Sequence, residues 1–232
     1  MSHFRIINYS NNCYLNVIIQ VFLCNKETSN LIAHHLDFKN ENGNKIISPK
    51  KLMLLLSKKM SVGRQNDSQE AFTQILDLIP ELEKLYINKI KNTYTCLKCN
   101  KKREVIEQFT TFYMHKDSIE NSIRDMIGDE KFELECEHCK MNTDTIKSCR
   151  IHTLANILVF FNVLKNKINY TENITYSNRK YKLKGIVKHF GCQRFGHYVY
   201  VNYPDKVIIN DLQINKCDTS DTKDIYLLVY SI

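Results

Sequence analysis

Two Cys-x-x-Cys pairs are the residues whose spacing most directly indicates chemistry. Cys96 and Cys99 form the first pair, and Cys136 and Cys139 form the second. Two such pairs can place four thiolates around a tetrahedral zinc ion, which leaves no open coordination position for a substrate. The pattern therefore predicts one structural zinc site. A redox dithiol or a chance spacing is the alternative, and His138, inside the second pair, is a minor alternative ligand.

A further cysteine opens an apolar segment near the N-terminus. Cys13 follows the polar residues 8–12 (Asn-Tyr-Ser-Asn-Asn) and precedes the densely apolar residues 15–23. A thiol at a helix N-terminus lies near the positive end of the peptide dipoles and near free N–H groups, which lower its pKa and can stabilise an oxyanion. A lone cysteine near a helix start is also often a buried apolar residue. The other single cysteines are predicted to be packing or surface residues: Cys24, Cys149, Cys192 and Cys217.

A histidine in the last third of the chain is a candidate partner for this thiol. His197 follows Phe195 and Gly196, and Asn210 and Asp211 come a short hairpin later. A histidine at the start of one strand and an Asn or Asp at the end of the next can meet, so that the second residue orients the imidazole. His197 alone is as typical of an ordinary strand, whereas Gly196 beside it indicates close approach by another backbone.

The elements that must position these residues change in type along the chain. Residues 15–23 are apolar on nearly all faces and predict a short buried helix. A second helix is predicted from Ser48, and a third from the capping-box sequence that begins at Asp67 and ends at Glu70. Strands are predicted at residues 105–112, 157–163, 186–189, 198–201 and 226–230. Helices followed by strands predict an α+β fold with a mostly antiparallel sheet, and residues 40–45 and 165–180 are expected to be loops.

Composition places these elements in one domain or two closely packed ones. The chain has 232 residues, 43% of them hydrophobic, with nine cysteines. No stretch predicts a membrane span or a signal peptide, so an intracellular, reducing location in the cytoplasm or nucleus is expected. A disulfide scaffold is not expected there. The net charge of +8 comes mostly from dispersed lysines, which favours a solvated basic surface over a nucleic-acid site.

The order of these pieces resembles the ubiquitin-specific protease family along nearly the whole chain. The cysteine box of that family reads roughly N-x-G-N-T-C-Y-M-N-S-x-x-Q, and residues 8–20 are similar to it. Residues 65–72 resemble the Q-Q-D-x-x-E-F-L segment, residues 151–161 the strand with L-P-x-x-L, and residues 181–189 the strand before the histidine box. Residues 225–230 resemble the closing A-Y-x-L-F-Y. The ordered set is far more specific than any single motif.

The resemblance implies a papain-like cysteine protease fold built like a hand. It implies a single catalytic domain over residues 1–232, with a helical thumb at about residues 1–90, zinc-stapled β fingers at about 91–150 and an antiparallel β palm at about 151–232. Ubiquitin and ubiquitinated proteins are the implied partners, with the ubiquitin tail between thumb and palm. One structural zinc ion is the implied metal, no organic cofactor is implied, and a monomer is expected.

The resemblance also implies a role for each site residue. Cys13 would be the nucleophile, His197 the general base and then acid, and Asn210 the residue that orients His197. Asn8 would donate its side-chain amide to the oxyanion, and Asp211 would support that site. From the residues alone, Asn210 and Asp211 are nearly equal candidates to orient the imidazole, because only one of two neighbours on a strand can face it.

Two substrate-binding residues and several departures complete the comparison with this family. Asp67 and Tyr198 are expected to contact the ubiquitin tail, although Asp67 is also a plain helix cap. Ser10 and Phe195 replace usual glycines, and Ala155 replaces the proline of L-P, so a different arrangement of the active-site loops is expected. A catalytically weak ubiquitin-binding scaffold and a basic zinc-ribbon protein that binds nucleic acid are the other functions considered. The scaffold does not need all catalytic residues, and the zinc ribbon leaves both catalytic boxes unexplained.

Overall fold

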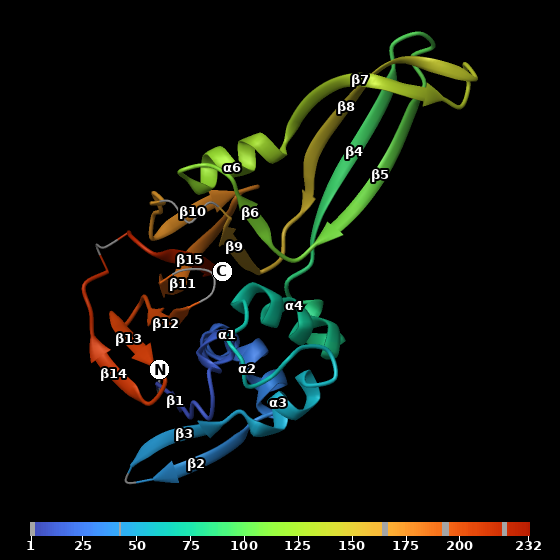
Figure 1. Ribbon diagram of the computed structural model, residues 1–232. Helices are drawn as coiled ribbons and strands as arrows, with labels where there is room; N and C mark the ends of the chain where they lie inside the picture. Colours follow the sequence, from blue (N-terminus) through green and yellow to red (C-terminus); the bar gives the residue numbers. More distant parts are fainter. Residues whose placement is uncertain (1–2, 42, 164–166, 192–194, 220–221) are drawn as a thin grey trace.

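The structure, a computed structural model, describes residues 3–41, 43–163, 167–191, 195–219 and 222–232. It has a helical part, a long arm of four strands and a large sheet, and the arm projects away from the other two (Figure 1). These parts correspond to the thumb, fingers and palm that the family resemblance implies. No helix in the described ranges is both long enough and apolar enough to span a membrane.

The thumb is built around α1 (Cys13–Leu23), whose residues are almost all buried. Its other helices are α2 (Lys26–Ala33), α3 (Lys50–Leu56), α4 (Ser68–Leu78) and α5 (Pro80–Glu83). The Asp67 side chain caps α4, as predicted, by accepting hydrogen bonds from the N–H groups of Gln69 and Glu70. The helix predicted from Ser48 begins later, because α3 starts at Lys50 and Pro49 takes the N-cap position.

A small sheet at the edge of the thumb was not predicted. It has the order β1 (Arg5–Ile6), β3 (Asn44–Ser48), β2 (Asp37–Glu41), with β1 parallel to β3. The expected loop at residues 40–45 is therefore wrong, since most of it belongs to β2 and β3. All five residues of β2 are exposed, so this edge strand lacks the alternation that predicts strands from sequence.

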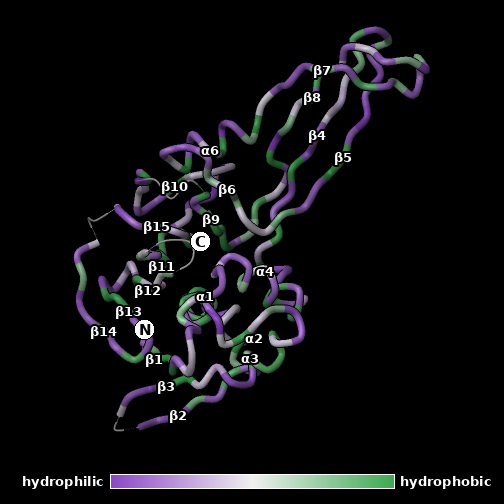
Figure 2. Tube along the Cα trace, viewed as in Figure 1, coloured by the Kyte–Doolittle hydropathy of each residue, from purple (hydrophilic) through white to green (hydrophobic). Residues whose placement is uncertain are grey.

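The fingers form an antiparallel sheet in the order β5 (Lys102–Phe109), β4 (Asn88–Cys96), β8 (Met141–Thr153), β7 (Gly128–Cys136). Each Cys-x-x-Cys pair lies at the turn of one hairpin at the tip. The turn residues Asn100 and Lys140 have positive φ angles of 57° and 53°, and each donates its N–H to the carbonyl of the first cysteine of its pair. Figure 2 shows that hydrophilic residues dominate along these strands.

The palm is an eight-stranded sheet in the order β14-β13-β12-β11-β15-β9-β6, with β10 paired to β11. Its pairs are antiparallel except that β6 is parallel to β9. Its strands are β6 (Phe112–Met114), β9 (Ile157–Asn162), β10 (Asn173–Tyr176), β11 (Arg179–Gly191), β12 (Gly196–Asn202), β13 (Val207–Asn210), β14 (Gln213–Lys216) and β15 (Ile225–Ser231).

Two parts of the palm lie in ranges for which the sequence predicted something else. Strand β6 joins the palm sheet and α6 (Ile119–Met126) contacts it, although both lie in the range 91–150 expected for the fingers. The range 165–180, expected to be a loop, contains β10. Residues of β10 form a strand because they pair with β11, whereas their own sequence has no strong alternation of apolar and polar residues.

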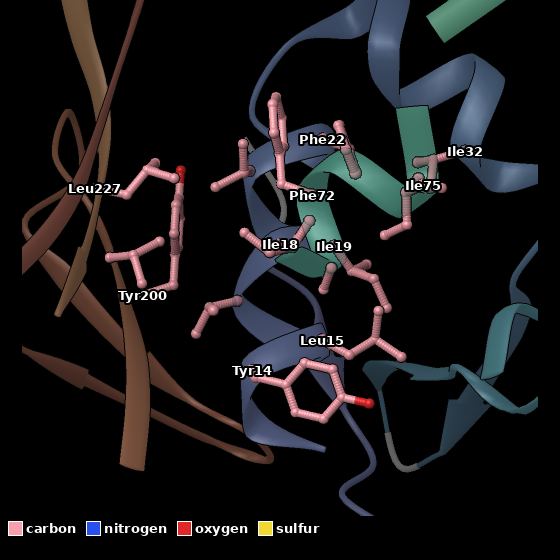
Figure 3. Packing of buried hydrophobic residues seen from close by; sticks show 14 of the residues in the cluster. Tyr14, Leu15, Ile18, Ile19, Phe22, Ile32, Phe72, Ile75, Tyr200 and Leu227 are labelled. Carbon is pink, nitrogen blue, oxygen red and sulfur yellow. The ribbon is translucent and has the colours of Figure 1, made fainter. Parts of the chain in front are cut away.

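Both faces of the palm sheet are covered by helices. Neighbouring residues of a strand point to opposite faces, so Leu227 packs in one cluster and Leu228 in the other. Tyr200 and Leu227 face Ile18 of α1 (Figure 3). Ile123 of α6 lies in the cluster on the other face. The palm and α1 therefore share one core, which fixes the first turn of α1 against β12.

Candidate active site

Cys13 is the first residue of α1 and is only 4% exposed. The loop before it is held by the buried side chain of Asn12. The Asn12 carboxamide oxygen accepts the N–H groups of Tyr9 (2.8 Å) and Ser10 (3.2 Å), and its nitrogen donates to the Asn16 side chain (2.9 Å). Because Asn12 is fully buried and bonded on several sides, the backbone that leads into Cys13 is fixed.

The environment of the Cys13 thiol raises its pKa above the ordinary value for cysteine. Burial is the largest cause, and the carboxylate of Asp211 adds to it. A hydrogen bond from the backbone N–H of Tyr198 opposes both effects. The expectation of a lowered pKa at a helix N-terminus is therefore wrong for this conformation, because desolvation outweighs the backbone N–H groups. The resting thiol is protonated and needs a base.

The structure brings His197 and Asn210 together. His197 is the second residue of β12 and Asn210 is the last residue of the adjacent strand β13. His197 Nε2 lies 2.7 Å from Asn210 Oδ1. With the carboxamide oxygen as acceptor, Nε2 carries the proton and Nδ1 is left as the basic nitrogen. Cys13 lines the same cavity as Gly196 and Tyr198, the two neighbours of His197, so the histidine segment lies beside the cysteine.

Asp211 is held away from this pair by its backbone. Its φ angle of 52° is in the left-handed region, which Asp tolerates better than most residues. Its carboxylate accepts hydrogen bonds from Asn8 Nδ2 (2.8 Å) and Asn16 Nδ2 (2.6 Å), and its carbonyl accepts the Ile6 N–H (3.0 Å). The Asn8 side-chain oxygen in turn accepts the Asn12 N–H (3.1 Å). Asp211 thus ties the palm to the loop before Cys13.

The cysteine opens into a cavity of about 640 Å³ between thumb and palm. Asp67 and Tyr198, the two expected substrate-binding residues, both line it. The Tyr226 hydroxyl donates a hydrogen bond to the Asp67 carboxylate. Burial and then the Asp67 charge raise the pKa of Tyr198 to about 12, so this phenol stays neutral. The cavity has these lining residues: Cys13, Tyr14, Gln65, Asn66, Asp67, Glu70, Phe161, Val163, His189, Gly196, Tyr198 and Tyr226.

Several polar residues of the site were given no role from the sequence. Asn12 and Asn16 hold the loop before Cys13, and Gln65 and His189 line the cavity. Asn16 lies in residues 8–20 and Gln65 in residues 65–72, two segments that resemble the protease family. That resemblance could have identified both as residues of the site. His189 sits at the end of an ordinary strand pattern, and its place in the cavity depends on the pairing of β11 with β12.

The four paired cysteines converge at the tip of the fingers. The Sγ atoms of Cys96, Cys99, Cys136 and Cys139 all lie within 4.8 Å of one another, and two of the separations are 4.0 and 3.7 Å. Thiolates at about 2.3 Å from a tetrahedral zinc ion are about 3.8 Å apart, so the donor set and the spacing both fit zinc. Within the described residues His138 is not part of the group.

A threonine hydroxyl also contacts the cysteine cluster. The Thr143 hydroxyl lies 3.2 Å from Cys96 Sγ, and this hydrogen bond is the main cause that lowers the pKa of Cys96 to about 6. Hydrogen bonds of this kind orient metal-bound thiolates and stabilise their charge. The separations within the cluster also exceed a disulfide bond length, and all four thiols are free.

The remaining cysteines have packing positions. Cys24 is buried at the end of α1, where burial raises its pKa to about 11. Cys149 is buried and Cys217 is half-buried, and burial raises the pKa of both. Cys192 lies outside the described residues.

Two solved structures with the same fold are chains of one assembly. A chain of the SAGA DUB module Ubp8/Sgf11/Sus1/Sgf73 bound to monoubiquitin superposes with a TM-score of 0.77 at 17% identity, covering 98% of this chain and 68% of the other. The same module bound to ubiquitin aldehyde also gives a TM-score of 0.77 at 17% identity, covering 100% of this chain and 69% of the other. These likenesses establish the fold.

Sequence comparison addresses the family. No curated protein sequence matches this chain. The sequence profile described as ubiquitin carboxyl-terminal hydrolase matches residues 4–230, which is almost the full length. The chain therefore belongs to the ubiquitin carboxyl-terminal hydrolase family, as a cysteine-type ubiquitin hydrolase with the thumb, palm and fingers of a ubiquitin-specific protease.

Proposed function

We propose that this enzyme hydrolyses the isopeptide or peptide bond after the C-terminal glycine of ubiquitin, with Cys13 as the nucleophile. One observation carries the assignment of the nucleophile. Cys13 lines the same cavity as Gly196 and Tyr198, the two residues on either side of His197, and the His197 ring is hydrogen-bonded to Asn210. A cysteine, a histidine and a residue that orients the histidine are the three parts of a thiol protease triad.

The proposed reaction begins with proton transfer. His197 accepts the Cys13 proton, and the thiolate attacks the glycine carbonyl carbon. The tetrahedral intermediate then collapses to a thioester, while His197 returns the proton to the leaving amine. In the second half, His197 removes a proton from water, which attacks the thioester and frees the ubiquitin carboxylate. Asn210 keeps the imidazole in one orientation through both halves.

Asn8 is the proposed oxyanion donor. Its side-chain nitrogen has two N–H bonds, and one of them is directed to the Asp211 carboxylate at 2.8 Å. The second remains available for a negatively charged oxygen at the start of α1. Because Asn8 also accepts the Asn12 N–H, its carboxamide is held at both ends before substrate arrives. In this proposal Asp211 acts through Asn8 and not through His197.

The cavity fits an extended tail with basic side chains. Asp67 and Glu70 line it and supply negative charge, while Tyr198 and Tyr226 supply apolar surface. The two solved neighbours are described as bound to monoubiquitin and to ubiquitin aldehyde. We accordingly propose ubiquitin as the substrate partner, with Asp67 and Tyr198 in contact with its tail.

The four cysteines at the finger tip are proposed to hold one zinc ion. With all four positions taken by thiolates, the ion would supply no catalysis and would fasten the β4–β5 hairpin to the β7–β8 hairpin. We further propose that the protein works as a monomer in the reducing cytoplasm or nucleus, where thiolate ligands persist. Metal analysis of the purified protein tests the zinc site, and light scattering tests whether the protein is a monomer.

A ubiquitin probe tests the function directly. Ubiquitin with a thiol-reactive group at its C-terminus is expected to form one covalent adduct with the wild-type protein. Cys13→Ala is expected to abolish the adduct. Cys24→Ala is the matched control, because Cys24 lies at the other end of the same helix and outside the cavity. Labelling that survives in Cys13→Ala contradicts the choice of nucleophile, and no labelling of wild type contradicts the function.

A further inference from the structure

A single side chain bridges the two walls of the catalytic cavity. Gln65 belongs to the loop between α3 and α4, and Gly196 is the first residue of β12, directly before His197. Gln65 Nε2 donates to the Gly196 carbonyl (3.0 Å), and Gln65 Oε1 accepts the Gly196 N–H (3.3 Å). A side-chain carboxamide has the same donor and acceptor as a peptide group. Gln65 therefore pairs with Gly196 as a short piece of strand would.

The sheet leaves a place for such a partner. Strand β12 pairs with β11 as far as the pair Gly191 and Gly196, but its pairing with β13 covers only Tyr200 to Asn202. In the described part of the chain, the start of β12 thus has a strand neighbour on one side only. The Gln65 carboxamide forms hydrogen bonds with the N–H and the carbonyl of Gly196, on the side of β12 that faces away from β11. An end of a strand that is paired on one side only is prone to fraying.

A second side chain lies against the same glycine. A Cβ atom on Gly196 would be 2.0 Å from His189 Nε2, 2.7 Å from His189 Cε1 and 3.0 Å from the Phe190 carbonyl oxygen, so a larger residue would force the imidazole to move. The His189 ring is itself packed, with its centroid 4.3 Å from the Tyr198 ring and 5.8 Å from the Tyr226 ring. His189 thus limits the position of Gly196 from one direction, and Gln65 limits it from another.

The loop that carries Gln65 is also held in place. Asn66 Nδ2 donates to the carbonyls of Ser61 (2.6 Å) and Arg64 (3.1 Å), which closes the loop on itself. The Ser10 hydroxyl, from the segment before Cys13, donates to the Gly63 carbonyl (3.3 Å). The contacts therefore run from the cysteine segment through this loop to Gly196.

We propose that Gln65 and His189 are positioning residues that hold Gly196 and thereby fix His197 for proton transfer with Cys13. The inference rests on the proposed function and adds to it. Asn210 sets the orientation of the His197 ring, but the location of its backbone depends on the start of β12. A displacement of about 1 Å between reacting groups can cost a hundredfold in rate. The Gln65 and His189 contacts prevent such a displacement.

Substitution of Gln65 separates positioning from substrate binding. Gln65→Ala is expected to lower kcat on a fluorogenic ubiquitin substrate about ten- to hundredfold, with KM changed less than about threefold. Gln108→Ala is the matched control, because Gln108 lies on finger strand β5, away from the cavity. A rise in KM with unchanged kcat would make Gln65 a substrate contact and overturn the proposal, as would wild-type kinetics.

A pair of variants tests the contact between His189 and Gly196. Gly196→Ala is expected to lower kcat at least about a hundredfold, since its Cβ would overlap the imidazole. The double variant His189→Ala/Gly196→Ala removes the overlapping atoms and is expected to recover at least about tenfold of that loss. A double variant no better than Gly196→Ala, although folded by circular dichroism, contradicts the packing role of His189.

A spectroscopic test does not depend on turnover. Histidine ring ¹H–¹⁵N spectra of the wild type are expected to show one dominant Nε2–H tautomer for His197, assigned with His197→Gln. Gln65→Ala is expected to broaden or split this signal, and Gln108→Ala to leave it unchanged. An unchanged signal in Gln65→Ala refutes the positioning role, even in a protein that reacts with the ubiquitin probe. Absence of probe labelling in wild type, with the spectral change present, refutes the proposed function and leaves the positioning role standing.

Discussion

Replacement of Asp211 by Asn is the sharpest test of how the oxyanion site is organised. The Asp211 carboxylate accepts one hydrogen bond from Asn8 and one from Asn16. An Asn at position 211 keeps the shape and tolerates the φ angle of 52°, but only its single carbonyl oxygen can accept. Asn16 is 3% exposed whereas Asn8 is exposed. We therefore expect the oxygen to remain with buried Asn16 and the new amide to repel the Asn8 amide.

The magnitude follows from these contacts. Asn8 can bond to water, so Asp211→Asn is expected to lower the free energy of unfolding by only about 1–2 kcal/mol. The loss of one oxyanion donor costs about 10²- to 10³-fold in kcat. A mispositioned Asn8 is expected to cost about ten- to a hundredfold, less than Asn8→Ala. The negative charge of Asp211 raises the pKa of Cys13, so its removal is expected to lower that pKa and increase the thiolate fraction at pH 7.

Two assays are expected to move in opposite directions. In Asp211→Asn, kcat on a fluorogenic ubiquitin substrate falls, while alkylation of Cys13 by iodoacetamide at pH 7 becomes faster. Asp77→Asn is the control, because Asp77 forms a surface ion pair with Lys59 at 3.5 Å and is expected to change neither assay. The Asp211 substitution is also expected to cost little in an Asn8→Ala background. An unchanged kcat, or a fall in both assays, refutes the reasoning.

Three further predictions concern the other parts of the site. Asn210→Ala is expected to lower kcat about ten- to a thousandfold while Asn210→Asp stays active, because a carboxylate can also orient His197; steady-state kinetics measure both. Chelation is expected to release one equivalent of zinc and to weaken ubiquitin binding without slowing Cys13 alkylation. Thr143→Val removes the hydroxyl beside Cys96 and is expected to weaken metal affinity about ten- to a hundredfold in a competition titration. Because burial raises the pKa of Cys13, its alkylation rate in the free enzyme is expected to rise with pH through a midpoint above the ordinary cysteine value of 9.0, and a midpoint below that value contradicts the buried resting state.

Strong local patterns made much of the fold predictable from the sequence. The buried helix after Cys13, the cap at Asp67 and the paired cysteines each depend on residues close together in the chain, so physical rules of short range apply to them. The edge strands β2 and β10 were missed for the opposite reason. Their residues have little alternation, and only pairing with β3 and β11 makes them strands.

The residues of the site were likewise predictable from the sequence only in part. Residue types and spacing alone identified the candidate nucleophile, the candidate base and the four thiolates. They left Asn210 and Asp211 nearly equal, because a strand pattern does not say where the strand ends. The tertiary structure places the last residue of β13 at Asn210 and turns Asp211 into a left-handed conformation, so that only Asn210 reaches His197.

The direction in which the pKa of the Cys13 thiol shifts could not be predicted from the sequence, for a related reason. The position of Cys13 at a helix start predicted a lowered pKa, but the burial that raises it comes from packing against the palm, far away in the chain. Desolvation depends on everything that surrounds a group in space, whereas a helix terminus is a local feature. The sequence by itself determined which groups are available for catalysis, and the tertiary structure decided their contacts, their burial and their protonation.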